Sequence, residues 1–105
     1  MANTLNRVSG TASTGAGTVI YTVPAGSVVT IIGLRATNTD TTSQHHVTVT
    51  VGGQNISGSE TPLPSGSGYE FTEGAKIVAI AGDEIVAVAD DSTSVELYVS
   101  YLEQS

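Results

Sequence analysis

The sequence predicts an all-β protein, a single antiparallel β-sandwich (jelly-roll or immunoglobulin-like) of about eight short strands with an extended N-terminal arm. Three observations support this fold class. A third of the 105 residues are β-branched Val, Ile and Thr, which suit pleated strands. Short segments of alternating polarity are separated by turn-forming residues at near-regular spacing. No window of about eleven residues has the period of an amphipathic helix.

The first part of the chain differs in composition from the rest. Ten of the first 17 residues are Asn, Thr, Ser or Gly, and only Leu5 and Val8 are sizeable apolar side chains. Such a segment cannot build a core of its own. We therefore expect residues 1–17 to form a flexible arm and residues 18–105 to form the sandwich domain. The arm either lacks order or adds a strand to a neighbour's sheet, with Leu5, Arg7 and Val8 as candidate partner-binding residues.

Strands are expected wherever apolar and polar residues alternate between turns. These segments are residues 18–23, 27–38, 46–51, 54–56, 69–72, 76–80, 84–89 and 95–102. In the longest, the even-numbered Val28, Ile32, Leu34 and Ala36 are expected to face the core and Arg35 to face outward. The clearest alternation places Val47, Val49 and Val51 inward.

Turn sequences end these strands. A Pro or Ala approach followed by Gly recurs three times, at Val23-Pro24-Ala25-Gly26, Leu63-Pro64-Ser65-Gly66 and Ile80-Ala81-Gly82-Asp83. In each, Gly is expected to supply the positive φ that the reversal requires. Gly52-Gly53 predicts a tight hairpin turn, and residues 58–68 are expected to form a loop.

Charge and composition exclude several classes of function. The chain has ten acidic and three basic residues, a net charge of −7. Arg7, Arg35 and Lys76 are too few for a nucleic-acid footprint. The absence of Cys excludes disulfides, thiolate zinc sites and cysteine nucleophiles. No apolar run approaches the roughly 18 residues of a membrane span, and residues 1–7 have no apolar core of a secretory signal.

We expect no enzymatic activity, because the titratable residues form no convergent catalytic constellation. No catalytic, cofactor-binding or metal-binding residue is assigned, and no cofactor is expected. His45 and His46 are neighbours that point to opposite faces of a strand, so they are interpreted as loop-end, solvent-facing residues. The alternative for these histidines is metal coordination or pH sensing across a symmetry axis.

The aspartates are interpreted as turn residues that bond their own backbone. They are Asp40, Asp83, Asp90 and Asp91. The alternative is a calcium site formed by Asp90 and Asp91 with neighbouring hydroxyl groups. The spaced acidic positions of an EF-hand loop are absent.

The whole pattern resembles a family. The features that carry the resemblance are the Gly/Ser/Thr-rich arm, Tyr21-Thr22-Val23-Pro24-Ala25-Gly26, Arg35-Ala36-Thr37-Asn38-Thr39, Gly52-Gly53, Ala81-Gly82-Asp83-Glu84-Ile85 and the final strand. They are similar to those of the small all-β virion proteins of tailed bacteriophages, most of all capsid decoration (cement) proteins.

The resemblance implies a structural role without catalysis. The expected function is to bind the outer capsid surface and to stabilise the shell by bridging capsomers. The expected partners are the major capsid protein and copies of the chain itself, as a trimer or dimer, with no nucleic acid and no membrane. The expected location is the virion, after synthesis in the host cytoplasm. The alternative is an accessory module of the tail, baseplate or fibre that binds host glycans.

Overall fold

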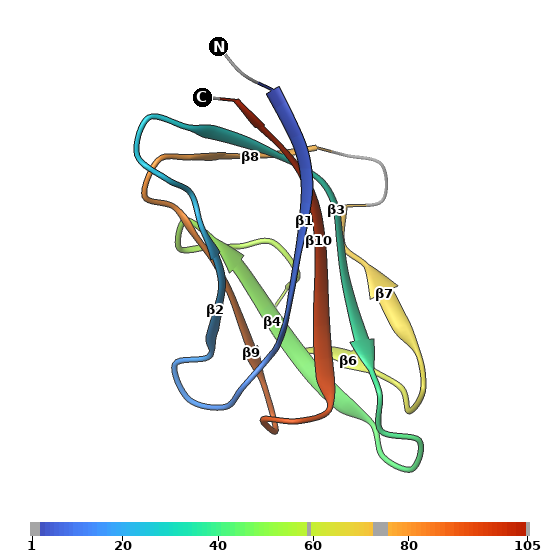
Figure 1. Cartoon of the computed structure of the whole chain (residues 1–105). Helices are drawn as coiled ribbons and strands as arrows, with labels where there is room; N and C mark the ends of the chain where they lie inside the picture. Colours follow the sequence, from blue (N-terminus) through green and yellow to red (C-terminus); the bar gives the residue numbers. More distant parts are fainter. Residues whose placement is uncertain (1–2, 59, 73–75, 105) are drawn as a thin grey trace.

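The computed structural model describes residues 3–58, 60–72 and 76–104 and confirms the predicted fold class (Figure 1). Ten strands form two five-stranded antiparallel sheets with a hydrophobic core between them. Two strands were not expected: the nine-residue β1 (Asn3–Thr11), and the three-residue β6 (Thr61–Leu63), which lies in the segment 58–68 that was expected to be a loop. Among the described residues, there is no helix long and apolar enough to cross a membrane.

In each sheet, two short strands lie along one edge of a longer strand, and each pairs with a different half of it. Sheet A has the order β1 (Asn3–Thr11), β10 (Val95–Gln104), β3 (Val28–Asn38) and β7 (Gly68–Glu70), with β8 (Ile77–Ile80) on the other half of β3. Sheet B has the order β2 (Thr18–Thr22), β9 (Glu84–Ala89), β4 (His45–Val51) and β5 (Gln54–Asn55), with β6 (Thr61–Leu63) on the other half of β4.

The segment expected to be a flexible arm is instead strand β1 of the chain's own sheet A. Figure 1 shows β1 alongside β10, and the two strands pair from Asn3↔Gln104 to Thr11↔Glu96. Without β1, the ten-residue β10 would be an edge with unpaired backbone groups. The low apolar content of the segment misled the prediction, because an edge strand can form with few core contacts. Residues 1–2 of the expected arm lie outside the described residues.

After β1 the chain crosses from sheet A to sheet B. Ala12 is fully buried and its N–H donates to the carbonyl of Val95, while Ser13 forms a parallel bridge to Val88 of β9. Gly10 faces Ile20 of β2 so closely that an added Cβ would lie 2.9 Å from its Cδ1 atom. The N-terminal segment is therefore part of the sandwich.

A bulge in β3 overturns the predicted alternation in its first half. Opposite β10, Gly33 pairs with Ser100 and Ile31 with Tyr101, so Ile32 is an extra residue. Before the bulge the odd positions Val29 and Ile31 are buried, and after it the even positions are buried. Val28 and Ile32 are therefore exposed rather than core-facing, whereas Leu34 and Ala36 face the core and Arg35 faces outward as predicted.

The predicted alternation in β4 and the predicted glycine turns are confirmed. Val47, Val49 and Val51 of β4 are buried. The three repeated turns each close with a backbone hydrogen bond across a positive-φ glycine: Ser27 to Pro24 over Gly26, Ser67 to Pro64 over Gly66, and Asp83 to Ile80 over Gly82. Gly52 and Gly53 both have positive φ in the β4–β5 turn. The sequence also predicts a turn at Glu73-Gly74, which lies outside the described residues.

The fully buried Asn38 joins three segments at the end of β3. Its Nδ2 atom donates to the carbonyl groups of Ser43 and Leu63, both at 3.0 Å, and its Oδ1 atom accepts the N–H of Asp40 at 2.9 Å. Buried polar atoms are costly unless they are paired. Asn38 therefore fixes the β3–β4 loop against the end of β6.

We expect Asn38→Ala to lower the free energy of unfolding by about 2–3 kcal/mol, because the buried carbonyl of Leu63 loses its donor. Asn38→Asp keeps the shape but removes the donor, so it should be at least as damaging at neutral pH. Denaturant unfolding measures both variants. Thr30→Ala on the same strand is the control and should cost under about 1 kcal/mol. A loss for Asn38→Ala no larger than that of the control would contradict this role.

Candidate functional site

The first candidate site is the outer face of sheet A, the face directed away from sheet B. Among the described residues, eight large apolar side chains are exposed, and six of them lie on this face. They are Leu5, Val28, Ile32, Val78, Ile80 and Tyr98. Such a concentration marks an interaction site more often than a random surface.

Strand register aligns these side chains in rows. One row runs Leu5, Leu102, Thr30, Val78 across β1, β10, β3 and β8. The next row runs Asn3, Gln104, Val28, Ile80. Side chains opposite each other on paired strands lie within about 5.5 Å. The two rows therefore form a continuous uncharged patch four strands wide, which we call the apolar patch.

Beside the apolar patch, the face is hollowed. An open hollow of about 430 Å³ is lined by Leu5, Asn6, Arg7, Ile32 and Ser100. The small Ser100 and Gly33 stand opposite each other here, so little side chain fills the space between Leu5 and Ile32. The bulge thus creates a depression next to the most exposed apolar side chain of the patch.

Charged groups on this face are few and balanced. On the strands of sheet A, the charged side chains at outward positions are Arg7, Arg35, Glu70 and Glu96. At these strand positions, two positive and two negative charges cancel; the exposed Lys76 lies directly before β8, outside the strands. The net charge of −7 is therefore carried by the rest of the molecule.

Hydrogen bonds fix two of these charged groups. Nη1 of Arg7 donates to the Tyr98 hydroxyl at 3.3 Å, and its guanidinium carbon lies 5.8 Å from the ring centroid, within cation–π range. The Leu34 N–H donates to Glu70 at 2.8 Å. Burial opposes ionisation of Glu70, but the hydrogen bonds from Thr72 and Leu34 outweigh it and lower the pKa of its carboxyl group.

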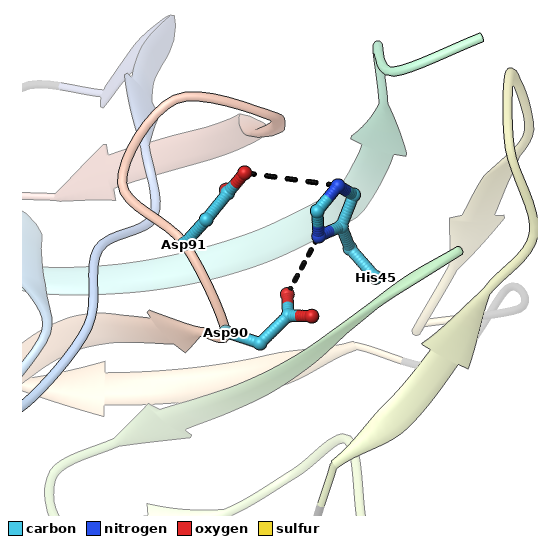
Figure 2. Close-up of side chains that lie close together, drawn as sticks. All are labelled: His45, Asp90 and Asp91. Atoms are coloured by element: carbon cyan, nitrogen blue, oxygen red, sulfur yellow. Dashed lines mark hydrogen bonds and ion pairs between the residues drawn. The ribbon is translucent and has the colours of Figure 1, made fainter. Parts of the chain in front are cut away.

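The second candidate site, which we call the His45 cluster, consists of His45 and the carboxylates of Asp40, Asp90 and Asp91. Figure 2 shows His45 with Asp90 and Asp91. The Nδ1 atom of His45 lies 2.9 Å from Asp90, and its Nε2 atom lies 2.9 Å from Asp40 and 3.7 Å from Asp91. Asp40 comes from the β3–β4 loop, and Asp90 and Asp91 come from the loop after β9. Only 12% of the His45 side chain is exposed.

Both ring nitrogens of His45 face carboxylate oxygens, which are acceptors, so both nitrogens must be N–H donors. Only the protonated imidazolium has two N–H donors, and this geometry therefore favours it. The hydrogen bond to Asp40 raises the pKa of His45 against the effect of burial, and Asp90 and Asp91 raise it further. The bond from His45 and those from Thr42 lower the pKa of Asp40. The pKa of Asp91 is lowered chiefly by the Ser94 hydroxyl. The cluster is thus an ion-pair clamp between two loops.

The same side chains define where a cation could bind. His45, Asp90 and Asp91 each bring one ligand atom within 4.8 Å of the others. A nitrogen and two carboxylate oxygens suit a divalent transition metal better than calcium, which prefers oxygen ligands. Metal binding would require His45 to lose its proton and to release an aspartate. Proton and metal therefore compete for the same ring nitrogens.

The structure separates the predicted site residues. Leu5, 71% exposed, and Arg7 lie on the outer face of sheet A. Val8 instead faces the interior, where it packs against the chain's own core. His45 and His46 point to opposite faces as predicted, but the solvent-facing interpretation is wrong for His45. His46 is more exposed and lies 3.4 Å from Glu60.

Three of the four aspartates follow the turn interpretation. Asp40, Asp83 and Asp91 accept hydrogen bonds from backbone N–H groups two or three residues away. Asp90 differs, because it accepts from His45 and from the His46 N–H across the sandwich end. The sequence did not predict that Asp40 and Asp90 contact His45, because these contacts depend on how two distant loops meet.

The apolar patch was not predicted, although the sequence contains a signal for it. Its strands contain runs with apolar residues at both parities, Val28-Val29-Thr30-Ile31-Ile32 and Ile77-Val78-Ala79-Ile80. Such runs are typical of strands covered on both faces. That signal is present in the sequence and could have indicated the patch.

Comparison of the chain with models of known protein families, with curated proteins and with solved structures gives no match.

The His45 cluster predicts a specific pH dependence of stability. Because folding raises the pKa of His45, its contribution is full below about pH 6.5 and is lost as pH rises through the folded pKa. Because folding lowers the pKa of Asp40 and Asp91, their contribution is full above about pH 4 and is lost as pH falls further. The cluster therefore stabilises the fold most between about pH 4 and 6.5.

We expect His45→Gln to lower Tm more at about pH 5.5 than at a pH above the raised folded pKa of His45, where the ring is neutral in both the folded and the unfolded state. His46→Gln is the matched control and should leave the pH profile of Tm close to that of the parent protein. Thermal unfolding across this range measures both. An equal loss for His45→Gln at the two pH values would contradict the imidazolium clamp.

Proposed function

We propose that the chain is a non-enzymatic structural protein of a bacteriophage virion, a decoration protein that binds the outer capsid surface and bridges capsomers. The chain is made in the host cytoplasm and acts on the virion. The observation that carries a structural role is the apolar patch on the outer face of sheet A. The resemblance of the sequence to small phage virion proteins supports the capsid setting.

The surface composition suits an assembled state. The chain has 27 Ser and Thr residues but only 13 charged ones. Long charged side chains lose more rotamer freedom when a partner covers them than hydroxyl side chains do. A surface of short side chains can therefore be covered at a smaller entropic cost. This property favours a protein that functions by binding other proteins.

The acidic remainder of the surface indicates how the chain would bind a shell. Asp40, Asp90 and Asp91 gather at one end of the sandwich, and Asp83 and Glu84 lie in the β8–β9 turn region. Opposite charges steer association and set orientation. We infer that basic patches of the major capsid protein are the complementary surface.

A tail, baseplate or fibre module that binds host glycans is the second candidate. The observation that favours it is the approach of His45, Asp90 and Asp91, because many extracellular binding modules depend on a cation.

Counting copies of the chain per particle separates the two locations. Quantitative mass spectrometry of purified virions of the phage that encodes the chain, scaled to the major capsid protein, gives this number. A capsid role predicts on the order of hundreds of copies, whereas a ring of the tail predicts about six or twelve. A value in the lower range would overturn the capsid proposal. Absence of the chain from purified particles would overturn the virion role altogether.

Cation addition tests the second candidate. We expect Tm at about pH 6 to change little with millimolar calcium, because the carboxylates of the His45 cluster already bind the imidazolium. The comparison is with chelator-treated protein and with His45→Gln. A rise in Tm of the parent protein on adding calcium, reversed by chelator, would favour the cation-dependent module instead.

A further inference from the structure

We propose that two copies of the chain dock through the outer faces of their A sheets, about a two-fold axis, to form a dimer. The inference deepens the proposed function, on which its biological purpose rests. Bridging requires a unit with at least two binding surfaces, and an isologous dimer supplies two identical ones. The partner that fits the apolar patch is therefore a second copy of the chain.

The sandwich core accounts for only part of the apolar residues of β3 and β8. The inward Val29, Ile31 and Ala79 are fully buried in the sandwich core. The outward Val78 and Ile80 are nevertheless 61% and 59% exposed. β-Strands with one solvated face carry polar residues on that face. These outward positions therefore have the composition of a face that is covered.

The distribution of charge indicates which partner covers the outer face of sheet A. The two rows of the apolar patch contain no charged side chain, and the charges at the outward strand positions of sheet A are balanced. The rest of the molecule carries the net charge of −7. A basic partner would be attracted to that acidic remainder and not to this face. An equally acidic molecule can approach closely only at an uncharged face, and a second copy of the chain meets this condition.

The shape of the face is compatible with contact between two copies. Leu5 protrudes beside the open hollow that lies between it and Ile32. In an arrangement with two-fold symmetry, Leu5 of each copy can enter the hollow of the other. The rim is complementary as well, because two arginines and two glutamates lie on each face and can pair across the interface. Face-packed sheets of this kind lie about 10 Å apart.

A dimer formed in this way leaves the acidic surfaces free. The His45 cluster is built by β4 of sheet B and by the loops after β3 and β9, outside the two rows of the apolar patch. Two such clusters would be exposed in each dimer. The dimer therefore has two equivalent acidic surfaces for contact with two capsomers.

Sedimentation of the purified full chain tests the dimer, with a pair of matched valine substitutions. Val78 lies in the apolar patch, and Val19 on β2 of sheet B is similarly exposed, at 50%. We expect a dimer of the parent protein at concentrations of about 100 μM. Val78→Glu should raise the dimer Kd at least about tenfold, because each interface would bury two unpaired carboxylates. Val19→Glu should leave the Kd within about threefold.

Salt dependence gives a second test that needs no variant. Association through an uncharged face of two acidic molecules should strengthen as salt rises to about 0.5 M, because salt screens their repulsion. Association through opposite charges should weaken. Backbone NMR shifts that move with protein concentration should map to β1, β8 and the outward positions of β3, not to sheet B.

Several results would overturn the dimer. They are a monomer at all concentrations, a trimer, an association that Val19→Glu disrupts and Val78→Glu does not, or shifts confined to sheet B. A monomer that nevertheless coats capsids in high copy number would disprove the dimer and leave the proposed function standing. A dimer that is absent from virions would support the interface and disprove the capsid role.

Discussion

Strand β3 is the constraint on which the rest of the sandwich depends. Its eleven residues pair with β10 along one side, and on the other side two short strands, β7 and β8, each pair with one half. The bulge at Ile32 lies between these halves and lets the strand change which parity faces the core. At its end, Asn38 connects β3 to the loops of sheet B. Both sheets are therefore positioned by one strand and the residue that ends it.

The bulge also links fold to surface. A regular strand would place Ile32 either in the core or in a row with its neighbours. The extra residue instead directs Ile32 outward next to Gly33, and the small side chain of Ser100 lies opposite. The hollow beside Leu5 results from this arrangement. A single irregularity of the backbone therefore provides both a core of correct parity and the shape of the proposed contact face.

Local patterns in the sequence predicted much of this fold, whereas relations between distant segments were not accessible. The alternation of Val47, Val49 and Val51 and the turn glycines act over a few residues, and both were confirmed. The strand character of residues 3–11 depends on β10, about ninety residues away. The partners of His45 depend on the meeting of two loops. The parity change in β3 depends on a bulge, which has no reliable signature in a run of Val and Ile.

The pairing of the first strand with the last also constrains the order of folding. Among the strands that the structure describes in sheet A, β1 pairs with β10 alone, about ninety residues further along the chain, so β1 is synthesised well before its partner. Until β10 is available, β1 has no place in the sheet, and contacts of such large sequence separation form slowly. Closure of this edge is therefore expected to be a late event. A strand with few apolar groups suits that role, because it exposes little apolar surface before it pairs with β10.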